Sequence, residues 1–416
     1  MVGAPLKRTN ARHHVTEHLE ELERLTDTAG ALVVGTLTQQ LDRPDPATYI
    51  GRGKVEELKA LIAEREATLI IFDDELSPAQ GKNLEGELAK RVIDRAELIL
   101  DIFAVRARSA EARMQVELAQ LEYSLPRLTR MWTHLEKFRG GIGVRGPGET
   151  QLETDRRLVG HRIKLLKERL AEVTKARHVQ RAGRTGTFRA SLVGYTNAGK
   201  SSILRGISGA REVFVEDRLF ATLDPLTREV ALGDHQSVLL TDTVGFIRKL
   251  PHHLVASFRA TLEEVQEADL LLHVIDASHP SWEEQRLVVD EVLADLGVHE
   301  IPMVYVFNKV DRLAPEVREA LEARIANLAP GSVFTSAASS DGLEPLRALL
   351  RERLRARRPE VELAVPMTDG RLIAEAHRIG EVTASTPDEE AGVLRVRGRF
   401  DAAALARLER AGATRS

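Results

Sequence analysis

The sequence contains no cysteine among its 416 residues. This absence excludes disulfide bonds, catalysis by a thiol and metal sites built on cysteine, and it is typical of proteins in a reducing compartment. No apolar run reaches the length of a membrane span, and residues 1–12 lack the apolar core of a secretory signal peptide. We therefore expect a cytoplasmic protein, monomeric in solution, that does not insert stably into a membrane.

The net charge of −4 is unevenly distributed along the chain. Residues 127–189 contain 16 Lys and Arg against 6 Asp and Glu, so the remainder of the chain is acidic. A basic block on an acidic protein is a candidate surface for a polyanion, although a solvated helical face would carry the same charges. The apolar content of 43% is ordinary for a chain that buries a core.

The apolar pattern divides the chain into four predicted parts. Residues 1–103 alternate helical and strand patterns, as a small α/β domain does, and residues 104–187 are helical on both sides of a glycine-rich tip. Residues 188–358 alternate strands and helices, and residues 359–416 indicate a small α+β domain. In the third part the apolar runs lack polar alternation, which favours a mostly parallel, doubly wound sheet covered on both faces. The predicted fold class is α/β.

Three local expectations concern the first half of the chain. Residues 31–37 have the apolar pattern of a strand. Ser77 is a plausible N-cap of a helix with Pro78 at its first position. From about residue 104 to 137 the pattern is continuously helical, so that this segment and residues 151–180 would form a long antiparallel helical hairpin.

Gly194 and Gly199 frame a Gly-x-x-x-x-Gly-Lys-Ser motif between a strand-forming and a helix-forming segment. Glycines let the backbone turn so that several N–H groups face an anion, and the helix N-terminus adds a partial positive charge. Lys200 is expected to reach the β- and γ-phosphates of a nucleotide, and the Ser201 hydroxyl to bind Mg²⁺. The expected contacts from this phosphate loop are Gly194, Tyr195, Thr196, Asn197, Ala198, Gly199, Lys200, Ser201 and Ser202.

A second signal, Asp242-Thr243-Val244-Gly245, follows an expected strand at 237–241. The Asp242 carboxylate can hold Mg²⁺ through a water molecule. The N–H of Gly245 can bond the γ-phosphate, because a side chain there would block the approach.

The strongest indication of nucleotide specificity is Asn308-Lys309-Val310-Asp311, after an apolar strand-forming segment. An Asp311 carboxylate can accept hydrogen bonds from the ring N–H and the exocyclic amine of guanine, whereas adenine would leave it unpaired. Asn308 would tie this loop to the phosphate loop. The small residues Ser336, Ala337 and Ala338 would let backbone N–H groups approach the guanine carbonyl.

Between these motifs lies Phe220-Ala221-Thr222-Leu223-Asp224, a loop that we expect to become ordered when the γ-phosphate is present. Thr222 is the best candidate for a second hydroxyl on Mg²⁺, but Thr227 lies nearby and spacing alone does not choose. Phe246 stands where many GTPases carry a water-orienting Gln, so we expect slow intrinsic hydrolysis. The side chain of Asn197 is a candidate ligand for K⁺, which would stabilise charge on the phosphates. The expected catalytic group is Lys200, Thr222, Gly245 and Asn197.

The glycine-rich tip between the two helical segments carries arginines, which suit phosphates, among glycines that permit close backbone approach. Contact with RNA is the functional interpretation, and a flexible connector is the alternative. The expected RNA-binding residues are Arg139, Gly141, Gly143, Arg145, Gly146, Gly148, Arg156 and Arg157.

Several stretches together resemble the HflX-type GTPases over almost the whole chain. Residues 141–157 are the most diagnostic, because generic GTPases lack this stretch. The stretches are TYIGRGKVEEL (48–58), DDELSPAQGKNLE (73–85), DRAELILDIFAVRA (94–107), GIGVRGPGETQLETDRR (141–157), GYTNAGKSS (194–202), LFATLDP (219–225), DTVGFI (242–247) and NKVD (308–311).

The resemblance implies a GTPase that binds GTP and GDP, associates with the large ribosomal subunit and its RNA, and splits ribosomes, notably under stress. It implies Mg²⁺ on Ser201 and Thr222, and it assigns the helical hairpin to RNA near the peptidyl-transfer region. The alternatives are a ribosome-assembly GTPase of another lineage and a nucleotide-gated RNA-binding or regulatory module that barely hydrolyses GTP, such as a regulator of a membrane protease.

Overall fold

The computed structural model describes residues 1–7, 15–130, 147–182, 187–209, 219–233, 236–250, 265–298, 300–339, 341–358 and 360–415. The chain forms two compact units. Unit 1 comprises Met1–Ala176 together with two short segments from later in the chain, Glu216–Asp224 and Arg248–Ala260. Unit 2 comprises Arg177–Val215, Pro225–Ile247 and Thr261–Ser416. Within the described residues, none of the helices is both long and apolar enough to cross a membrane.

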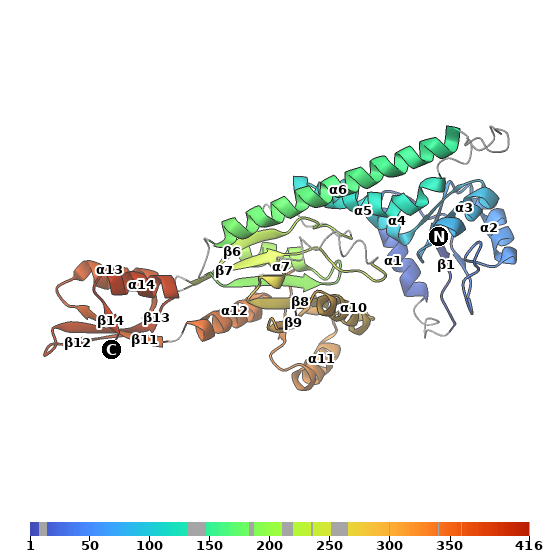
Figure 1. Ribbon diagram of the computed structural model, residues 1–416. Coiled ribbons are helices and arrows are strands. Elements are labelled where there is room, and N and C mark those ends of the chain that lie inside the picture. The colour runs from blue at the N-terminus through green and yellow to red at the C-terminus, as the bar shows by residue number, and fades with distance from the viewer. Residues whose placement is uncertain are drawn as a thin grey trace. The chain divides into compact units, whose positions relative to one another are not determined.

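Unit 1 contains a four-stranded parallel sheet in the order β2-β1-β3-β4 (Figure 1). Buried apolar side chains of the strands pack against those of α2 and α3, including Phe72, Val55 and Leu84. The strands are β1 (Val2–Gly3), β2 (Leu37–Thr38), β3 (Leu69–Phe72) and β4 (Arg91–Asp94), and the first helices are α1 (Val15–Thr28), α2 (Arg52–Arg65) and α3 (Pro78–Leu88).

The start of α3 follows from local sequence, as predicted. The Ser77 side chain accepts a hydrogen bond from the N–H of Gln80, and the Gln80 side chain accepts one from the N–H of Ser77. Pro78 occupies the first turn, where its missing N–H costs nothing. These two reciprocal hydrogen bonds form within four consecutive residues, so the helix start can be read from the local sequence.

The strand expected at 31–37 is wrong over most of its length. Only Leu37 and Thr38 form a strand, because pairing requires a neighbouring backbone and β1 offers only Val2 and Gly3. Leu32 is 86% exposed, so the apolar run that suggested a strand lies largely at the surface.

The continuous helix expected from residue 104 is also wrong, because it is interrupted at Ala107–Ser109. Helix α4 (Arg95–Arg106) ends there, and Ser109 caps α5 (Ala110–Ser124) by accepting a hydrogen bond from the N–H of Ala112. A 3₁₀ helix, Leu125–Arg130, follows. Within the described residues, the first arm of the expected hairpin is therefore divided into α4, α5 and a 3₁₀ helix.

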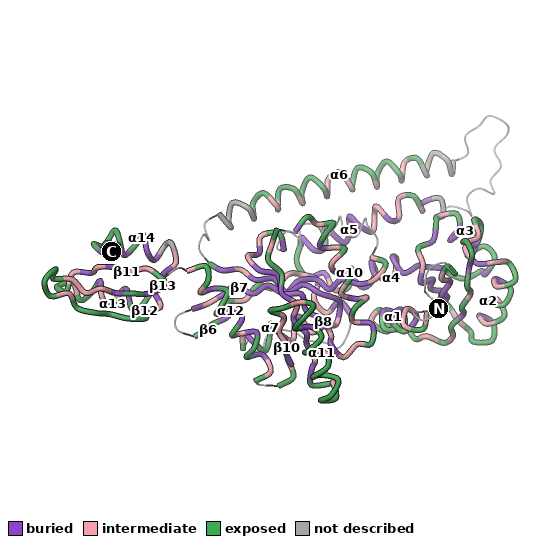
Figure 2. The backbone as a smooth tube through the Cα atoms, turned by 90° about the horizontal axis from the view of Figure 1, so that it is seen from below, coloured by how far each residue is buried: buried purple, intermediate pink, exposed green. Residues whose placement is uncertain are grey.

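The second arm is one long helix, α6 (Pro147–Ala182). In unit 1 ion pairs of Arg162 with Glu117 and of Lys167 with Glu122 join it to α5, and Leu166, between these two residues in the sequence, is fully buried. Figure 2 shows that the rest of its described surface is mostly exposed. Residues 131–146, which include most of the glycine-rich tip, lie outside the described part of the chain.

Unit 2 is built on a six-stranded sheet in the order β10-β9-β8-β5-β7-β6. Only β6 pairs antiparallel with its neighbour, so the sheet is mostly parallel, as predicted. The strands are β5 (Arg189–Gly194), β6 (Leu226–Gly233), β7 (Gln236–Asp242), β8 (Leu270–Asp276), β9 (Met303–Asn308) and β10 (Val333–Phe334).

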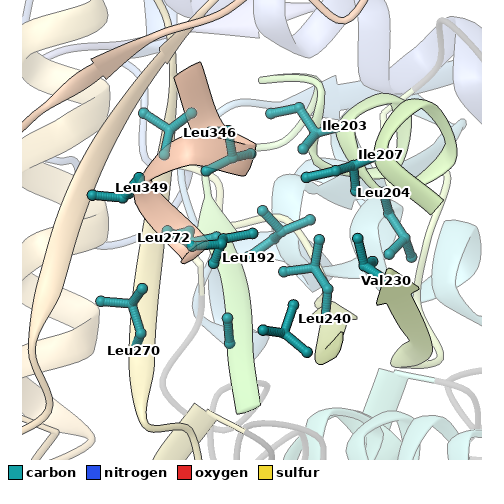
Figure 3. Close-up of a cluster of buried hydrophobic side chains, with 14 of the residues drawn as sticks. Leu192, Ile203, Leu204, Ile207, Val230, Leu240, Leu270, Leu272, Leu346 and Leu349 are labelled. Carbon is teal, nitrogen blue, oxygen red and sulfur yellow. The ribbon is translucent and has the colours of Figure 1, made fainter. Parts of the chain in front are cut away.

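Helices cover both faces of this sheet. On one face α7 and α12 pack on the strands, and Figure 3 shows Ile203 and Leu346 meeting Leu192, Leu240 and Leu272 in this cluster. A second, separate cluster joins Ile325 of α11 to Ile275 and Phe307, which lie near the carboxyl ends of β8 and β9. The helices are α7 (Lys200–Ser208), α10 (Trp282–Asp295), α11 (Pro315–Leu328) and α12 (Glu344–Arg357).

The C-terminal residues form an antiparallel sheet in the order β12-β13-β11-β14, and α13 and α14 share one core with it (Figure 1). The chain order strand–helix–strand–strand–helix–strand with this pairing is the ferredoxin-like arrangement. The pattern missed β12 and β14, which are exposed edge strands with few apolar residues. The elements are β11 (Glu360–Pro366), α13 (Gly370–Ile379), β12 (Glu381–Asp388), β13 (Val393–Arg399), α14 (Ala402–Arg410) and β14 (Thr414–Arg415).

Candidate nucleotide site

The phosphate loop joins β5 to α7 in unit 2, in the strand–loop–helix context that the motif requires. Gly194 has φ +148°, and a Cβ atom there would lie 2.2 Å from the carbonyl oxygen of Val274. Gly199 has φ +99°, and a Cβ atom there would lie 2.2 Å from Nδ2 of Asn308. Both positions therefore exclude any side chain for two reasons, backbone conformation and space.

Lys200, the first residue of α7, is buried beneath this loop with 5% of its surface exposed. Its Nζ donates to the carbonyl oxygens of Gly194, at 3.0 Å, and Tyr195, at 2.9 Å. Burial lowers the pKa of the Lys200 ammonium to about 8, although the Asp242 carboxylate acts in the opposite direction. The ammonium group is thus held at the loop in an environment that favours a compensating anion.

Ser201, in the first turn of α7, meets Asp242, the last residue of β7, which is a parallel neighbour of β5 in the sheet. The Ser201 hydroxyl donates to Oδ2 of Asp242 at 2.6 Å, and Asp242 is fully buried. A hydroxyl and a carboxylate at this spacing are oxygen donors of the kind that Mg²⁺ prefers. The residues present therefore fit the metal that the motifs imply.

The segment after Asp242 lies directly against the phosphate loop. The N–H of Phe246 donates to the Gly194 carbonyl at 3.1 Å, and the N–H of Thr196 donates to the Phe246 carbonyl at 2.7 Å. A Cβ atom on Gly245 would lie 2.6 Å from Cα of Thr196, which explains the glycine. The Phe246 side chain is 1% exposed, so it is a buried anchor for this segment.

Thr243 and Val244, the two middle residues of the second motif, are also expected nucleotide contacts, and both are buried. The Thr243 hydroxyl donates to the carbonyl oxygen of Leu192 at 2.7 Å. This hydrogen bond ties the segment to β5.

The third motif follows β9 and meets the phosphate loop from the other side. Nδ2 of Asn308 donates to the carbonyl oxygen of Ala198 at 3.0 Å. Nζ of Lys309 donates to the carbonyl oxygen of Asn197 at 2.8 Å. The sequence argument foresaw the first of these links and did not foresee the second.

Ser336 and its neighbours face the same motif. The Ser336 hydroxyl donates to Oδ1 of Asp311 at 2.6 Å, and the N–H of Ala337 donates to Oδ1 of Asn308 at 3.3 Å. The N–H of Ala338 is held by Oγ of Ser336 at 3.3 Å. The Asp311 carboxylate is thus oriented by a hydroxyl on the adjacent loop. Val310 is 5% exposed and packs in an apolar cluster.

The loop Phe220–Asp224 belongs to unit 1 and makes its described contacts there. Phe220 packs edge-on against Phe103, with ring centroids 4.6 Å apart. The Asp224 carboxylate accepts hydrogen bonds from the N–H groups of Arg108 and Ser109 and from the Ser109 hydroxyl. Ala221 and Thr222 are half-buried and Leu223 is buried.

Of the residues expected to bind RNA, Arg156 and Arg157 lie on α6 and are exposed. Gly148 lies in the first turn of the same helix. Arg139, Gly141, Gly143, Arg145 and Gly146 lie outside the described residues.

The sequence argument missed two polar residues at the strand ends. Asp276 closes β8 and accepts a hydrogen bond from Nζ of Lys309, and the Thr335 hydroxyl donates to Oδ1 of Asn308 at 3.3 Å. A signal for Asp276 existed, since it ends an apolar strand whose carboxyl end lies at the same sheet edge as the motifs.

Lys200→Met tests the burial of the charged amine. Because the folded-state pKa of about 8 lies below the ordinary 10.5, the unfolded chain binds more protons between these values, and wild-type stability should rise there. The unfolding free energy of the wild type should increase relative to that of Lys200→Met by up to about 1.4 kcal/mol per pH unit. Urea denaturation of the two nucleotide-free proteins at about pH 7.5 and about pH 9.5 measures this difference in unfolding free energy. A pH-independent difference, as expected for the exposed control Lys175→Met, would contradict this assignment.

Comparison with known proteins finds matching family models along the chain and a solved structure of similar fold. Family models match residues 16–104 (GTP-binding GTPase N-terminal), 106–184 (GTP-binding GTPase middle region) and 189–309 (50S ribosome-binding GTPase). A GTP-binding protein from the archaeon Sulfolobus solfataricus, solved in complex with GDP, is 24% identical with a TM-score of 0.44, covering 85% of this chain and 99% of its own.

Curated relatives match over most of their length. The GTPase HflX of Magnetococcus marinus is 46% identical over 94% of this chain and 90% of its own. The GTPase HflX of Escherichia coli is 45% identical over 92% of this chain and 89% of its own. With the phosphate loop and the loop of Asn308 and Asp311 assembled at one sheet edge, the chain belongs to the HflX family of GTPases and is a GTP hydrolase.

Proposed function

We propose that the GTP-bound protein binds the large ribosomal subunit and its RNA, dissociates ribosomes, and is released when GTP is hydrolysed to GDP. The observation that carries the proposal is α6, a long exposed helix in the basic block of a chain that also holds a GTPase site. A family model described as a 50S ribosome-binding GTPase matches residues 189–309. Such a partner would keep the protein at the ribosome in the cytoplasm.

The exposed part of α6 supports RNA as the ligand. Its described residues 153–176 contain seven Lys and Arg against four Asp and Glu. Arg162 and Lys167 form ion pairs with acidic residues of α5, whereas Arg156 and Arg157 are exposed and follow the glycine-rich tip in the sequence. Lys and Arg side chains displayed along the exposed face of a helix are the groups that bind nucleic-acid phosphates.

For the nucleotide, the proposal assigns the phosphates to residues 194–202 and guanine to Asp311. The orientation of the Asp311 carboxylate by Ser336 supports a role in reading the base edge. Ser201, Thr222 and, through water, Asp242 would hold Mg²⁺, which supplies charge neutralisation on the phosphates when bound. Gly245 and the loop of Thr222 would then respond to the γ-phosphate.

Hydrolysis in this proposal is slow until a further group completes the site. Phe246 is buried and can offer only its backbone, which already bonds the phosphate loop. Lys200 would stabilise charge on the phosphates, and K⁺ held by the side chain of Asn197 would add to it. Asn197 lies in the left-handed backbone region at φ +61°, within the loop itself.

Asp311→Asn should exchange guanine preference for xanthine preference, because the amide donates where the carboxylate accepted. The ratio of dissociation constants for GDP and xanthosine diphosphate measures this change. Asp295→Asn, an exposed substitution at the end of α10, is the matched control and should leave the ratio unchanged. Retention of guanine selectivity by Asp311→Asn would refute the assigned role.

Arg156→Ala together with Arg157→Ala should weaken binding to large ribosomal subunits and flatten its dependence on salt, with GTP affinity intact. Co-sedimentation with a non-hydrolysable GTP analogue across a salt series measures this, and the exposed Arg353→Ala in α12 is the control. If GTP affinity fell equally, the division of roles between α6 and the nucleotide site would be wrong.

Multiple-turnover hydrolysis should be slow alone and accelerate when large subunits are added. We expect the rate in K⁺ to exceed the rate in Na⁺ if Asn197 holds the cation, and Asn197→Ala to abolish that difference. Equal rates in the two salts would remove K⁺ from the proposal. No stimulation by ribosomes, together with no co-sedimentation, would overturn the proposed function and favour a module that barely hydrolyses GTP.

A further inference from the structure

Asp276 ends β8 at a point where three loops of unit 2 meet. Strand β8 pairs parallel with β9, and Asp276 lies opposite Asn308 in the register. The N–H of Ala277 donates to the carbonyl oxygen of Asn308 at 2.9 Å, which fixes the exit of one strand against the next. Asp276 is therefore held by strand pairing directly opposite Asn308, the first residue of the loop that we assign to guanine.

Both carboxylate oxygens of Asp276 accept hydrogen bonds. Oδ1 accepts from the N–H of Ser278 at 3.0 Å and from its hydroxyl at 2.6 Å. Oδ2 accepts from Nζ of Lys309 at 2.7 Å. Ser278, in the turn after β8, thus fixes Oδ1, and Oδ2 is directed at the ammonium group of Lys309.

Lys309 bridges this carboxylate and the phosphate loop. Its Nζ also donates to the carbonyl oxygen of Asn197 at 2.8 Å, and its Cε lies 3.9 Å from the Cβ position of Gly199. The side chains of Lys309 and Asp276 are 15% and 13% exposed. A pair so largely removed from water is costly to break, because the remaining charge loses its partner and is poorly hydrated.

We propose that Asp276 is a positioning residue for the guanine nucleotide. Its carboxylate fixes Lys309 against the phosphate loop, so that the phosphate loop and the loop 308–311 are held in one arrangement before the nucleotide binds. This rests on the proposed assignment of Asn308–Asp311 to guanine. The second link between the loops, from Asn308 to Ala198, is direct and does not involve Asp276.

The charge of Asp276 also compensates a cluster of cations. The ammonium of Lys309 contributes to lowering the pKa of buried Lys200, so the two amines repel each other. Without the Asp276 carboxylate, the ammonium group of Lys309 would be more stable in water than beside the phosphate loop. Its hydrogen bond to the carbonyl oxygen of Asn197 would then be lost. Because the effect concerns the arrangement of both loops and not the γ-phosphate, it should weaken GTP and GDP binding equally.

Asp276→Asn should raise the dissociation constants of GTP and GDP by about tenfold each, with their ratio unchanged. Ser278→Ala, which removes one hydrogen bond and keeps the charge, should raise both by about threefold. Asp295→Asn, an exposed carboxylate of unit 2, is the control and should bind GDP like the wild type. Fluorescent GDP and GTP analogues, titrated into the full chain, measure all these constants.

A double-mutant cycle with Lys309→Gln separates positioning from general stabilisation. If Asp276 acts through Lys309, the double variant should bind GDP no more weakly than Lys309→Gln alone. Fully additive losses, or wild-type affinity in both Asp276→Asn and Ser278→Ala, would overturn the proposal. Asp311→Asn belongs in the same series. Retained guanine selectivity in Asp311→Asn would refute the base assignment. A shift of Asp311→Asn to xanthine, together with wild-type GDP and GTP affinity in Asp276→Asn, would refute only the role of Asp276.

Discussion

The nucleotide site depends on one steric constraint, the absence of a side chain at Gly199. A Cβ atom there would lie 2.2 Å from the Asn308 amide nitrogen, so any other residue would separate the phosphate loop from the end of β9. The same relation recurs at Gly194 against Val274 and at Gly245 against Thr196. The loops that follow β5, β7 and β9 thus approach one another closely enough for backbone carbonyls to accept side-chain hydrogen bonds across them.

Close approach brings charges together, and their balance sets the chemistry of the site. Lys200 is buried under the phosphate loop and its pKa is lowered, while Lys309 lies on the other side of that loop. Asp242 and Asp276 supply compensating carboxylates from the ends of β7 and β8. The parallel sheet directs all four groups to one edge, where a polyphosphate finds donors already oriented and little reorganisation remains to be done on binding.

Sequence patterns predicted those parts whose cause is local or periodic. The Ser77 cap needs only its own four residues, and the runs of β8 and β9 are apolar because both faces of the sheet are covered. The pattern failed at residues 31–36, since the length of a strand depends on the partner strand available. It also missed the break at Ala107–Ser109, because helical residues continue on both sides of a capping serine.

The sequence alone determined the fold class and the family, and it located the motif Asn308–Asp311 that we propose reads guanine, because the spacing of residues within one strand–loop–helix unit is preserved when the chain folds. Only the tertiary structure decided which groups bridge the loops. Asp276 lies 33 positions before Lys309, and Phe246 serves as a buried anchor whose backbone bonds Gly194. Such contacts depend on which strands are neighbours in the sheet and on the residue at which each strand ends. The order of strands in the sheet is not encoded in any local sequence pattern.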